Sequence, residues 1–116
     1  MATRAELLQQ HCRERKGSAL ADAQVHAQLA ELPDWTLRDG ALARTYKFAN
    51  YYETIAFVNA LAFMVHREDH HPDLVVGYNR CEVRFSTHSV GGISDNDFIC
   101  AAKADAIFAQ QFGVAA

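Results

Sequence analysis

Residues 50–65 read NYYETIAFVNALAFMV, and they form the clearest helical pattern in the chain. Asn50 is a typical helix N-cap. Apolar residues follow it at helical spacing: Tyr51, Ile55, Val58, Ala62 and Val65. A second flank carries Phe57, Leu61 and Met64, so the apolar arc is wider than one contact with a sheet requires. The pattern predicts a long helix that is buried on two sides, once inside the domain and once between subunits.

The segment before this helix predicts a first β-hairpin. Residues 35–38 alternate apolar and polar side chains, and Asp39-Gly40 is a typical two-residue turn. The apolar residues after the turn are Leu42, Tyr46 and Phe48. Arg44 interrupts their alternation. Farther upstream, good helix formers over residues 19–32 predict a helix that Pro33 ends.

The segment after the long helix predicts a second hairpin and a last helix. Pro72 is expected to end the long helix. The alternating residues of the hairpin are Leu74, Val76 and Tyr78 on one strand and Cys81, Val83, Phe85 and Thr87 on the other. A turn at Asn79-Arg80 is expected to join them, with His88 on the polar face of the second strand. Ser94 and Asp97 resemble a capping box that begins the last helix. The order α-β-β-α-β-β-α predicts an α+β fold, a four-stranded antiparallel sheet with helices packed on one face.

The composition narrows the class of protein. A chain of 116 residues suits one domain, expected over 19–116 behind a polar arm at 1–18 that is loosely helical or disordered. The 11 basic and 14 acidic residues form no run of five or six like charges, which argues against a nucleic-acid surface. Charged residues interrupt any signal or membrane segment in the arm, so we expect a cytoplasmic protein with no membrane partner. The three cysteines, Cys12, Cys81 and Cys100, form no CxxC pair and are interpreted as reduced apolar residues.

Four of the six histidines lie within residues 66–88: His66, His70, His71 and His88. They fall near a helix end and a strand end, where side chains converge without disrupting a core. One interpretation is that they are solvated residues at the ends of elements. Another is a metal site on His66 and His70, but the intervening glutamate is not at the second place of a zinc-protease motif. The third, which the clustering favours, is metal-free general acid and base catalysis, because an imidazole pKa of about 6.5 suits proton transfer.

The spacing of these residues resembles a known family. His66, His70-His71-Pro72, Tyr78, His88 and Asp97 stand in the order and spacing of the pterin-4a-carbinolamine dehydratase signature, and the resemblance spans residues 19–112. It implies dehydration of 4a-hydroxytetrahydropterin, the carbinolamine that aromatic amino-acid hydroxylases leave, to quinonoid dihydropterin and water. It implies no metal and no cofactor, since the pterin is the substrate. It also implies a homodimer or homotetramer, with edge strands and helices forming the contacts between subunits.

The resemblance further implies a set of site residues. The expected catalytic residues are His71 as the base toward N5, and His70 and His88 as acids toward the C4a hydroxyl. The expected pterin-binding residues are Asp69, His70, His71, Ser86, Thr87, His88, Ser89 and Asp97. Asp97 is expected to orient His88, to cap its helix, or both. Leu74 and Asn96 depart from members that have tryptophan and arginine there, which affects the rim of the pocket and the charge beside Asp97.

Two other functions stay open at this point. Some animal members of the family act as dimerisation partners of a homeodomain transcription factor, and other relatives are linked to molybdenum-cofactor metabolism. The chain could therefore be a regulatory partner protein or a pterin-binding protein. The intact histidine set favours catalysis, because a pure scaffold would leave these positions free to change.

Overall fold

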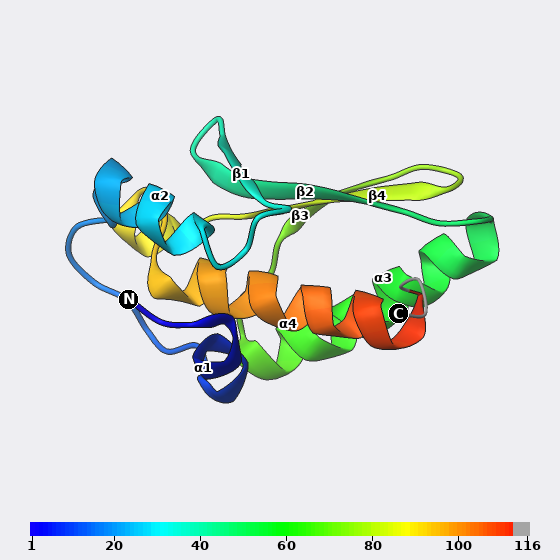
Figure 1. Cartoon of the computed structure of the whole chain (residues 1–116), viewed down its shortest axis with the longest axis horizontal. Helices are drawn as coiled ribbons and strands as arrows, with labels where there is room; N and C mark the ends of the chain where they lie inside the picture. The colour runs from blue at the N-terminus through cyan, green and yellow to red at the C-terminus, as the bar shows by residue number, and fades with distance from the viewer. Residues whose placement is uncertain (113–116) are drawn as a thin grey trace.

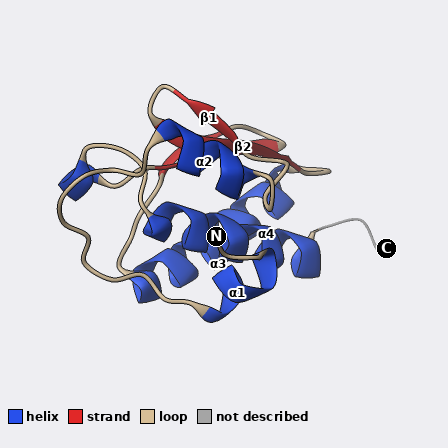
Figure 2. Cartoon of the chain, turned by 60° about the vertical axis from the view of Figure 1, so that its left-hand side comes forward, coloured by secondary structure: helices blue, strands red, loops and turns tan. Residues whose placement is uncertain are grey.

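A four-stranded sheet covers a layer of helices in the computed structural model, which describes residues 1–112 (Figure 1). The elements are α1 (Arg4–Gln9), α2 (Asp22–Leu29), β1 (Thr36–Arg38), β2 (Ala41–Lys47), α3 (Tyr51–Glu68), β3 (Asp73–Val76), β4 (Arg80–Phe85), the 3-10 turn η1 (His88–Val90) and α4 (Asp95–Gln111). All strand pairs are antiparallel, in the order β1-β2-β4-β3. Figure 2 shows the helices on one side of the sheet. The predicted fold class is confirmed, although the predicted domain end at 113–116 lies outside the described residues.

The two hairpins differ in how well their turns were predicted. The first turn is Asp39-Gly40 as predicted, with both residues at positive φ (52° and 76°), which a two-residue turn between twisted strands requires. The second turn is Tyr78-Asn79, one residue earlier than predicted. The N–H of Gly77 donates to the carbonyl of Arg80 at 2.8 Å, and this bond closes the hairpin. Tyr78 is therefore an exposed turn residue instead of a strand residue.

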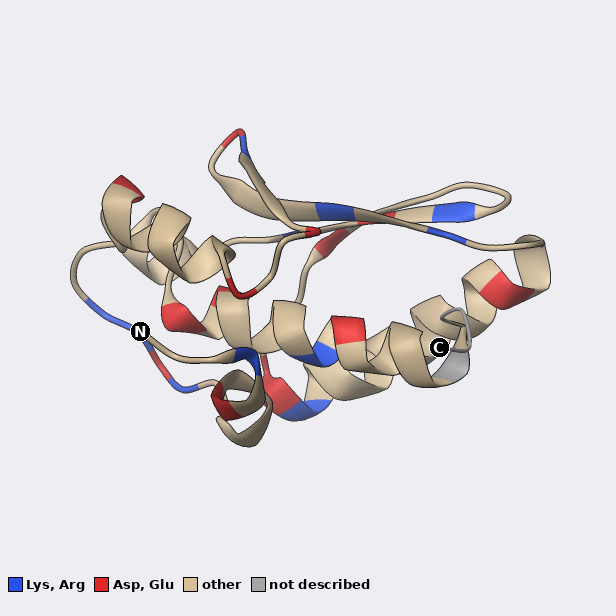
Figure 3. Cartoon of the chain, viewed as in Figure 1, with Lys and Arg blue, Asp and Glu red and all other residues tan. Residues whose placement is uncertain are grey.

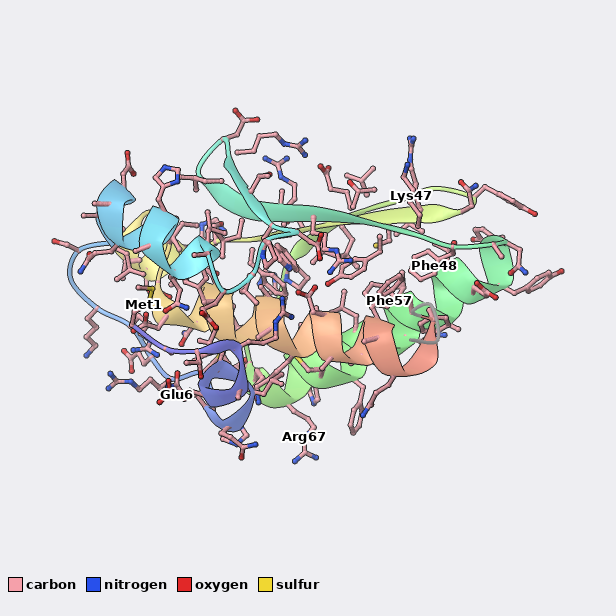
Figure 4. All side chains as sticks on the ribbon, viewed as in Figure 1. Met1, Glu6, Lys47, Phe48, Phe57 and Arg67 are labelled. Atoms are coloured by element: carbon pink, nitrogen blue, oxygen red, sulfur yellow. The ribbon has the colours of Figure 1, made fainter. Side chains whose placement is uncertain are left out.

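Helix α3 buries Phe57 and Leu61 of the second predicted flank together with Val65 of the first. Its buried residues are Thr54, Phe57, Leu61, Val65 and Glu68, whereas Tyr51 and Ala62 are exposed. This buried face is hard to recognise in the sequence because the residues at its two ends, Thr54 and Glu68, are polar. Thr54 Oγ1 donates to the carbonyl of Tyr78 at 2.9 Å, and Glu68 accepts from the N-terminal arm, so both polar ends are buried with partners. In Figure 4, Phe48 and Phe57 point into the space between sheet and helices, and their ring centroids are 5.3 Å apart.

Arg44 does not break the alternation of β2. It lies on the same inward face as Leu42 and Tyr46, with its guanidinium carbon 4.3 Å from the centre of the Tyr46 ring. It donates to Asp105 of α4 at 2.7 Å, so a buried carboxylate satisfies the inward charge. Figure 3 shows both signs of charge spread over the helices and strands, as the composition predicted.

The N-terminal arm (residues 1–18) is ordered along part of its length. Thr3 and Glu6 form a capping box at α1, and Leu7 is buried against the core. Helix α2 is shorter than the predicted 19–32 and ends at Leu29, ahead of Pro33. Within residues 1–112, no helix combines the length and the apolar character needed to cross a membrane.

Candidate functional site

A cavity of about 510 Å³ opens where the end of α3, the end of β4 and the N-terminal arm meet. It brings together the three predicted catalytic histidines, His70, His71 and His88. Four of the predicted binding residues also line it, namely Asp69, Ser86, Thr87 and Ser89. His66 is exposed on the last turn of α3 and is not among the lining residues. Three of the residues that the sequence grouped by spacing, His70, His71 and His88, thus line one cavity.

Helix α3 delivers the histidine pair by ending earlier than Pro72 predicts. Asp69 takes a left-handed conformation (φ 54°) as the C-cap, so the chain leaves the helix just before His70 and His71. The peptide N–H of His70 still donates back to the carbonyl of Val65 at 3.1 Å, which fixes the exit. Pro72 then restricts the backbone of His71 and starts the approach to β3.

His88 lies in the turn η1 and not on the polar face of a strand as predicted. Strand β4 ends at Phe85, and the chain then forms a short loop in which Thr87 and Gly92 pair with each other. The N–H of Thr87 donates to the carbonyl of Gly92 at 2.7 Å, and Gly91 (φ 68°) ends η1. This tight loop carries Ser86 to Ser89 along the wall of the cavity.

Asp97 is fully buried behind the cavity and pairs with His70, where His88 was the expected partner. Its Oδ1 lies 2.6 Å from His70 Nε2. Its Oδ2 accepts from Thr87 Oγ1 at 2.8 Å and from the N–H of Ser94 at 2.9 Å. The second of these bonds belongs to the predicted capping box of α4, which is confirmed. Asp97 therefore caps its helix and orients a histidine at the same time, without lining the cavity itself.

The three histidines are held very differently. The side chain of His70 is 11% exposed and stacks on Phe85, with ring centroids 6.0 Å apart and planes 12° from parallel. Its Nε2 lies 2.6 Å from Asp97 Oδ1, and this contact fixes the orientation of the ring. His71 and His88 are exposed. The cavity thus combines one fixed imidazole with two that are open to solvent and ligand.

The N-terminal arm forms a wall of the cavity, which the sequence did not predict. Residues 12–15 line it together with Glu68 and Asn96. Asn96 accepts from the N–H of Arg13 at 3.2 Å and from Arg15 Nε at 2.9 Å, and its amide donates to the carbonyl of Arg13 at 2.7 Å. At position 96, where some family members have arginine, this chain thus uses asparagine to hold an arginine of the arm. No local pattern reveals these contacts, since the partners lie far apart in the sequence.

Glu68 is the second anchor of the arm. It accepts from the N–H of Cys12 at 2.7 Å and lies 2.9 Å from His11 Nδ1 and 3.2 Å from Lys103 Nζ. Burial alone would raise the pKa of Glu68, but the hydrogen bonds from Cys12, His11 and Lys103 outweigh it and lower the pKa to about 2. Glu68 is therefore a carboxylate that binds the arm. Among residues 1–112, no group of three or more His, Cys, Asp or Glu is placed to hold a metal ion.

Comparisons with known proteins agree with the resemblance in the sequence. Residues 18–107 match the family model described as pterin 4 alpha carbinolamine dehydratase. A relative from Xanthomonas campestris pv. campestris (strain B100) is 56% identical over 108 residues, which cover 90% of this chain and 92% of the relative. Another from Stenotrophomonas maltophilia (strain K279a) is 55% identical over 114 residues, or 95% and 98% of the two chains. Both carry the name "Putative pterin-4-alpha-carbinolamine dehydratase".

Two solved structures share the fold. One, from Brucella melitensis, is described as a transcriptional coactivator/pterin dehydratase; it has a TM-score of 0.74 and 30% identity and covers 78% of this chain and 98% of its own. The other is described as a pterin dehydratase-like protein that is a RuBisCO assembly factor in the alpha-carboxysome. Its TM-score is 0.53 at 23% identity, with 63% and 84% of the two chains covered, so this likeness shows the fold alone.

Proposed function

Because this chain belongs to the pterin 4 alpha carbinolamine dehydratase family, we propose that it removes water from 4a-hydroxytetrahydropterin and releases quinonoid dihydropterin. The observation that carries the proposal is the convergence of His70, His71 and His88 on one cavity. In the reaction the C4a–O bond breaks, the hydroxyl takes up a proton and leaves as water, and N5 loses its proton. The site therefore needs one proton donor and one proton acceptor on a bound bicyclic ring.

The cavity suits such a ring in size and in polar groups. Its volume of about 510 Å³ is within the usual range for small-molecule sites. Asp69, Ser86 and Ser89 add a carboxylate and two hydroxyls to its lining, which complement the amino, imino and carbonyl groups of a pterin edge. Thr87 also lines the cavity, but its hydroxyl already donates to Asp97. Asp97 does not line the cavity, and it acts on the site through its contact with His70.

We assign His71 as the base toward N5 and His70 and His88 as acids toward the hydroxyl. Asp97 supports the assignment of His70, because a buried carboxylate at 2.6 Å is placed to balance the charge of an imidazolium. His71 and His88 are exposed, which suits groups that exchange protons with water between turnovers. The reaction needs no metal and no cofactor in this proposal.

The direct test follows the absorbance change as synthetic 4a-hydroxytetrahydropterin is dehydrated. We expect the wild type to accelerate the reaction, and His71→Ala and His88→Ala each to lower kcat by about 10²- to 10⁴-fold, the usual contribution of a positioned acid or base. His66→Ala is the matched control, since it removes an imidazole from the same helix end outside the cavity. It should retain wild-type turnover.

Two results would overturn the proposal. If the wild type gives no acceleration, the chain is not a dehydratase. If His71→Ala and His88→Ala both keep full kcat, the histidine mechanism is wrong even though the activity stands. A loss in His66→Ala equal to that in His71→Ala would show that the assay reports general damage.

We also propose that the chain works as a homodimer or homotetramer in the cytoplasm. Strand β3 is an edge of the sheet, and Leu74, Val75 and Val76 on it are exposed. Phe63 is exposed on α3. Exposed apolar side chains on an edge strand and on a helix are typical of surfaces that a second subunit covers. A monomer in light scattering across micromolar concentrations would contradict this assembly.

A second candidate function is that of a regulatory partner protein. It is favoured by the likeness to the Brucella melitensis protein, whose description joins coactivator and dehydratase. The two functions make different demands on the cavity, because only catalysis needs the histidines. The absorbance assay therefore separates them.

A further inference from the structure

Two of the three cysteines are in contact across two segments of the chain. Cys12 lies in the N-terminal arm and Cys100 lies in helix α4. Cys12 Sγ and Cys100 Sγ are 3.5 Å apart, and both thiols are free. Cys12 lines the histidine cavity, and Cys100 is fully buried beneath it. We propose that Cys12 and Cys100 form a reversible disulfide under oxidising conditions and so lock the arm onto α4 beside the catalytic cavity.

The surroundings hold the two sulfurs in place. The N–H of Cys12 donates to Glu68 at 2.7 Å, and its thiol contacts the carbonyl of Asn96 at 3.6 Å. Cys100 is fixed by the core around it and lies 4.0 Å from the carbonyl of His70. A disulfide bond is about 2.05 Å long, so the sulfurs must approach by about 1.5 Å. Side-chain rotation with a small shift of the arm supplies a movement of that size.

The two thiols have different roles in the reaction. The contact with Cys12, together with burial, raises the pKa of Cys100, so Cys100 is not the thiolate that begins the reaction. Cys12 is half-buried at the cavity and is the group that a small oxidant reaches. With hydrogen peroxide as the oxidant, the Cys12 thiolate attacks one oxygen and breaks the O–O bond, forming a sulfenic acid and a hydroxide ion that takes up the proton Cys12 has released. The Cys100 sulfur then attacks the Cys12 sulfur and passes its proton to the S–OH oxygen, which leaves as water. The two cysteines are thereby oxidised by two electrons, and hydrogen peroxide is reduced to two molecules of water.

The disulfide reaches the proposed active site through the arm. Arg13, Glu14 and Arg15 follow Cys12 directly and line the cavity. In the reduced protein, hydrogen bonds to Glu68 and Asn96 hold this wall. In the oxidised protein the disulfide between Cys12 and Cys100 also holds this wall, so the arm cannot move away from α4. Disulfides of this kind, in a reducing compartment, are typically transient and redox-sensing.

The test is the mass of the full-length protein after treatment with hydrogen peroxide and then with a thiol reductant. We expect a loss of about 2 Da on oxidation, recovered on reduction, and a peptide map that joins Cys12 to Cys100. The oxidised protein should unfold at a Tm at least about 5 °C higher, since the bond closes a long loop. Cys12→Ser should abolish both changes. Cys81→Ala is the matched control and should keep both, because Cys81 Sγ has its contact with the carbonyl of Glu82 instead.

Other products would overturn the proposal. Gains of about 16 to 48 Da on Cys12 without a link to Cys100 would show that the thiols do not meet. A bond between two chains, or an unchanged mass in peroxide, would equally exclude the internal disulfide. Mass does not depend on turnover, so this result stands whether or not the dehydratase assay succeeds. Cys12→Ser tests the proposal even if changes at the buried Cys100 prevent folding.

Discussion

Helix α4 carries two buried carboxylates about two turns apart, and they serve opposite purposes. Asp97 is 0% exposed and Asp105 is 5% exposed. Asp97 pairs with His70, whose ring lines the cavity. Asp105 instead accepts from the core, from the sheet and from helix α1, and none of these partners lines that cavity. These partners are Trp35 Nε1 at 3.0 Å, Arg44 at 2.7 Å, the hydroxyl of Tyr46 at 2.5 Å and Arg4 at 3.1 Å.

The difference lies in where each hydrogen-bond network ends. Burial and the nearby carboxylate of Asp105 raise the pKa of Tyr46, so the phenol keeps its proton and acts only as a donor. The arginines around Asp105 are permanently charged. That network therefore has no proton to exchange near neutral pH. The network of Asp97 ends on an imidazole that borders the cavity, so the same kind of buried carboxylate can serve chemistry. A buried, fully bonded carboxylate marks a functional site only if its partner reaches a ligand.

The largest expected effect is the loss of stability in Asp105→Ala. The substitution leaves Trp35, Tyr46 and Arg44 without their buried acceptor. Breaking one side of a buried ionic cluster typically costs about 3–5 kcal/mol, and we expect that decrease in the free energy of unfolding by urea denaturation. Turnover per folded molecule should be unchanged.

Asp34→Ala is the control for this substitution. Asp34 also lies near Arg44, at 3.6 Å, but its side chain is exposed. It should change the free energy of unfolding by less than about 0.5 kcal/mol. If Asp105→Ala costs no more than Asp34→Ala, the cluster does not stabilise the core in the way we describe.

The next effect is the loss of turnover in Asp97→Asn. The amide has no charge to balance an imidazolium on His70, and it holds the ring less firmly. We expect kcat to fall by about 10²-fold, equivalent to about 2.7 kcal/mol, with KM little changed.

Asp95→Asn is the matched control, since Asp95 is an exposed acidic residue in the same first turn of α4. It should keep the wild-type kcat. If Asp97→Asn loses stability but keeps the wild-type kcat, Asp97 only caps its helix. In that case the contrast with Asp105 disappears.

Of the contacts that Asp97 makes, the sequence predicted those that depend on a local pattern of residues. The capping box of Ser94 and Asp97 could be recognised because its residues are three positions apart. The pairing of Asp97 with His70 could not, because it depends on where α3 ends relative to α4. The left-handed residue Asp69 sets that end, ahead of Pro72, which is the clearest stop signal in the sequence. A pattern predicts which residues belong to a site more readily than which of them touch.

The N-terminal arm is a second case in which local patterns did not predict the contacts between distant segments. Its charged residues are typical of a solvated segment, and the predicted boundary at residue 18 separates it from the domain. Its contacts nevertheless depend on Glu68 and Asn96, which are polar residues in helices with no local sign of burial. Val83 and Phe85, by contrast, lie where the alternation of apolar residues predicts a core. Apolar burial is periodic in the sequence, whereas buried polar contacts between distant segments are not.

The smallest expected effect concerns Glu68, the carboxylate that binds the arm. Its pKa of about 2 lies below the usual 4.5, so its contribution to stability is complete above about pH 5 and is lost as the pH falls toward 2. We expect Glu68→Gln to weaken the docking of the arm by about 1–3 kcal/mol at pH 7, measured by hydrogen exchange at the N–H of Cys12. The difference between wild type and variant should shrink between pH 5 and about pH 2, because acid protonates the wild-type carboxylate. Glu14→Gln, at an exposed acidic residue of the same cavity wall, should show no such pH dependence. A difference that grows in acid would mean that Glu68 holds the arm as a neutral group, unlike either carboxylate of α4.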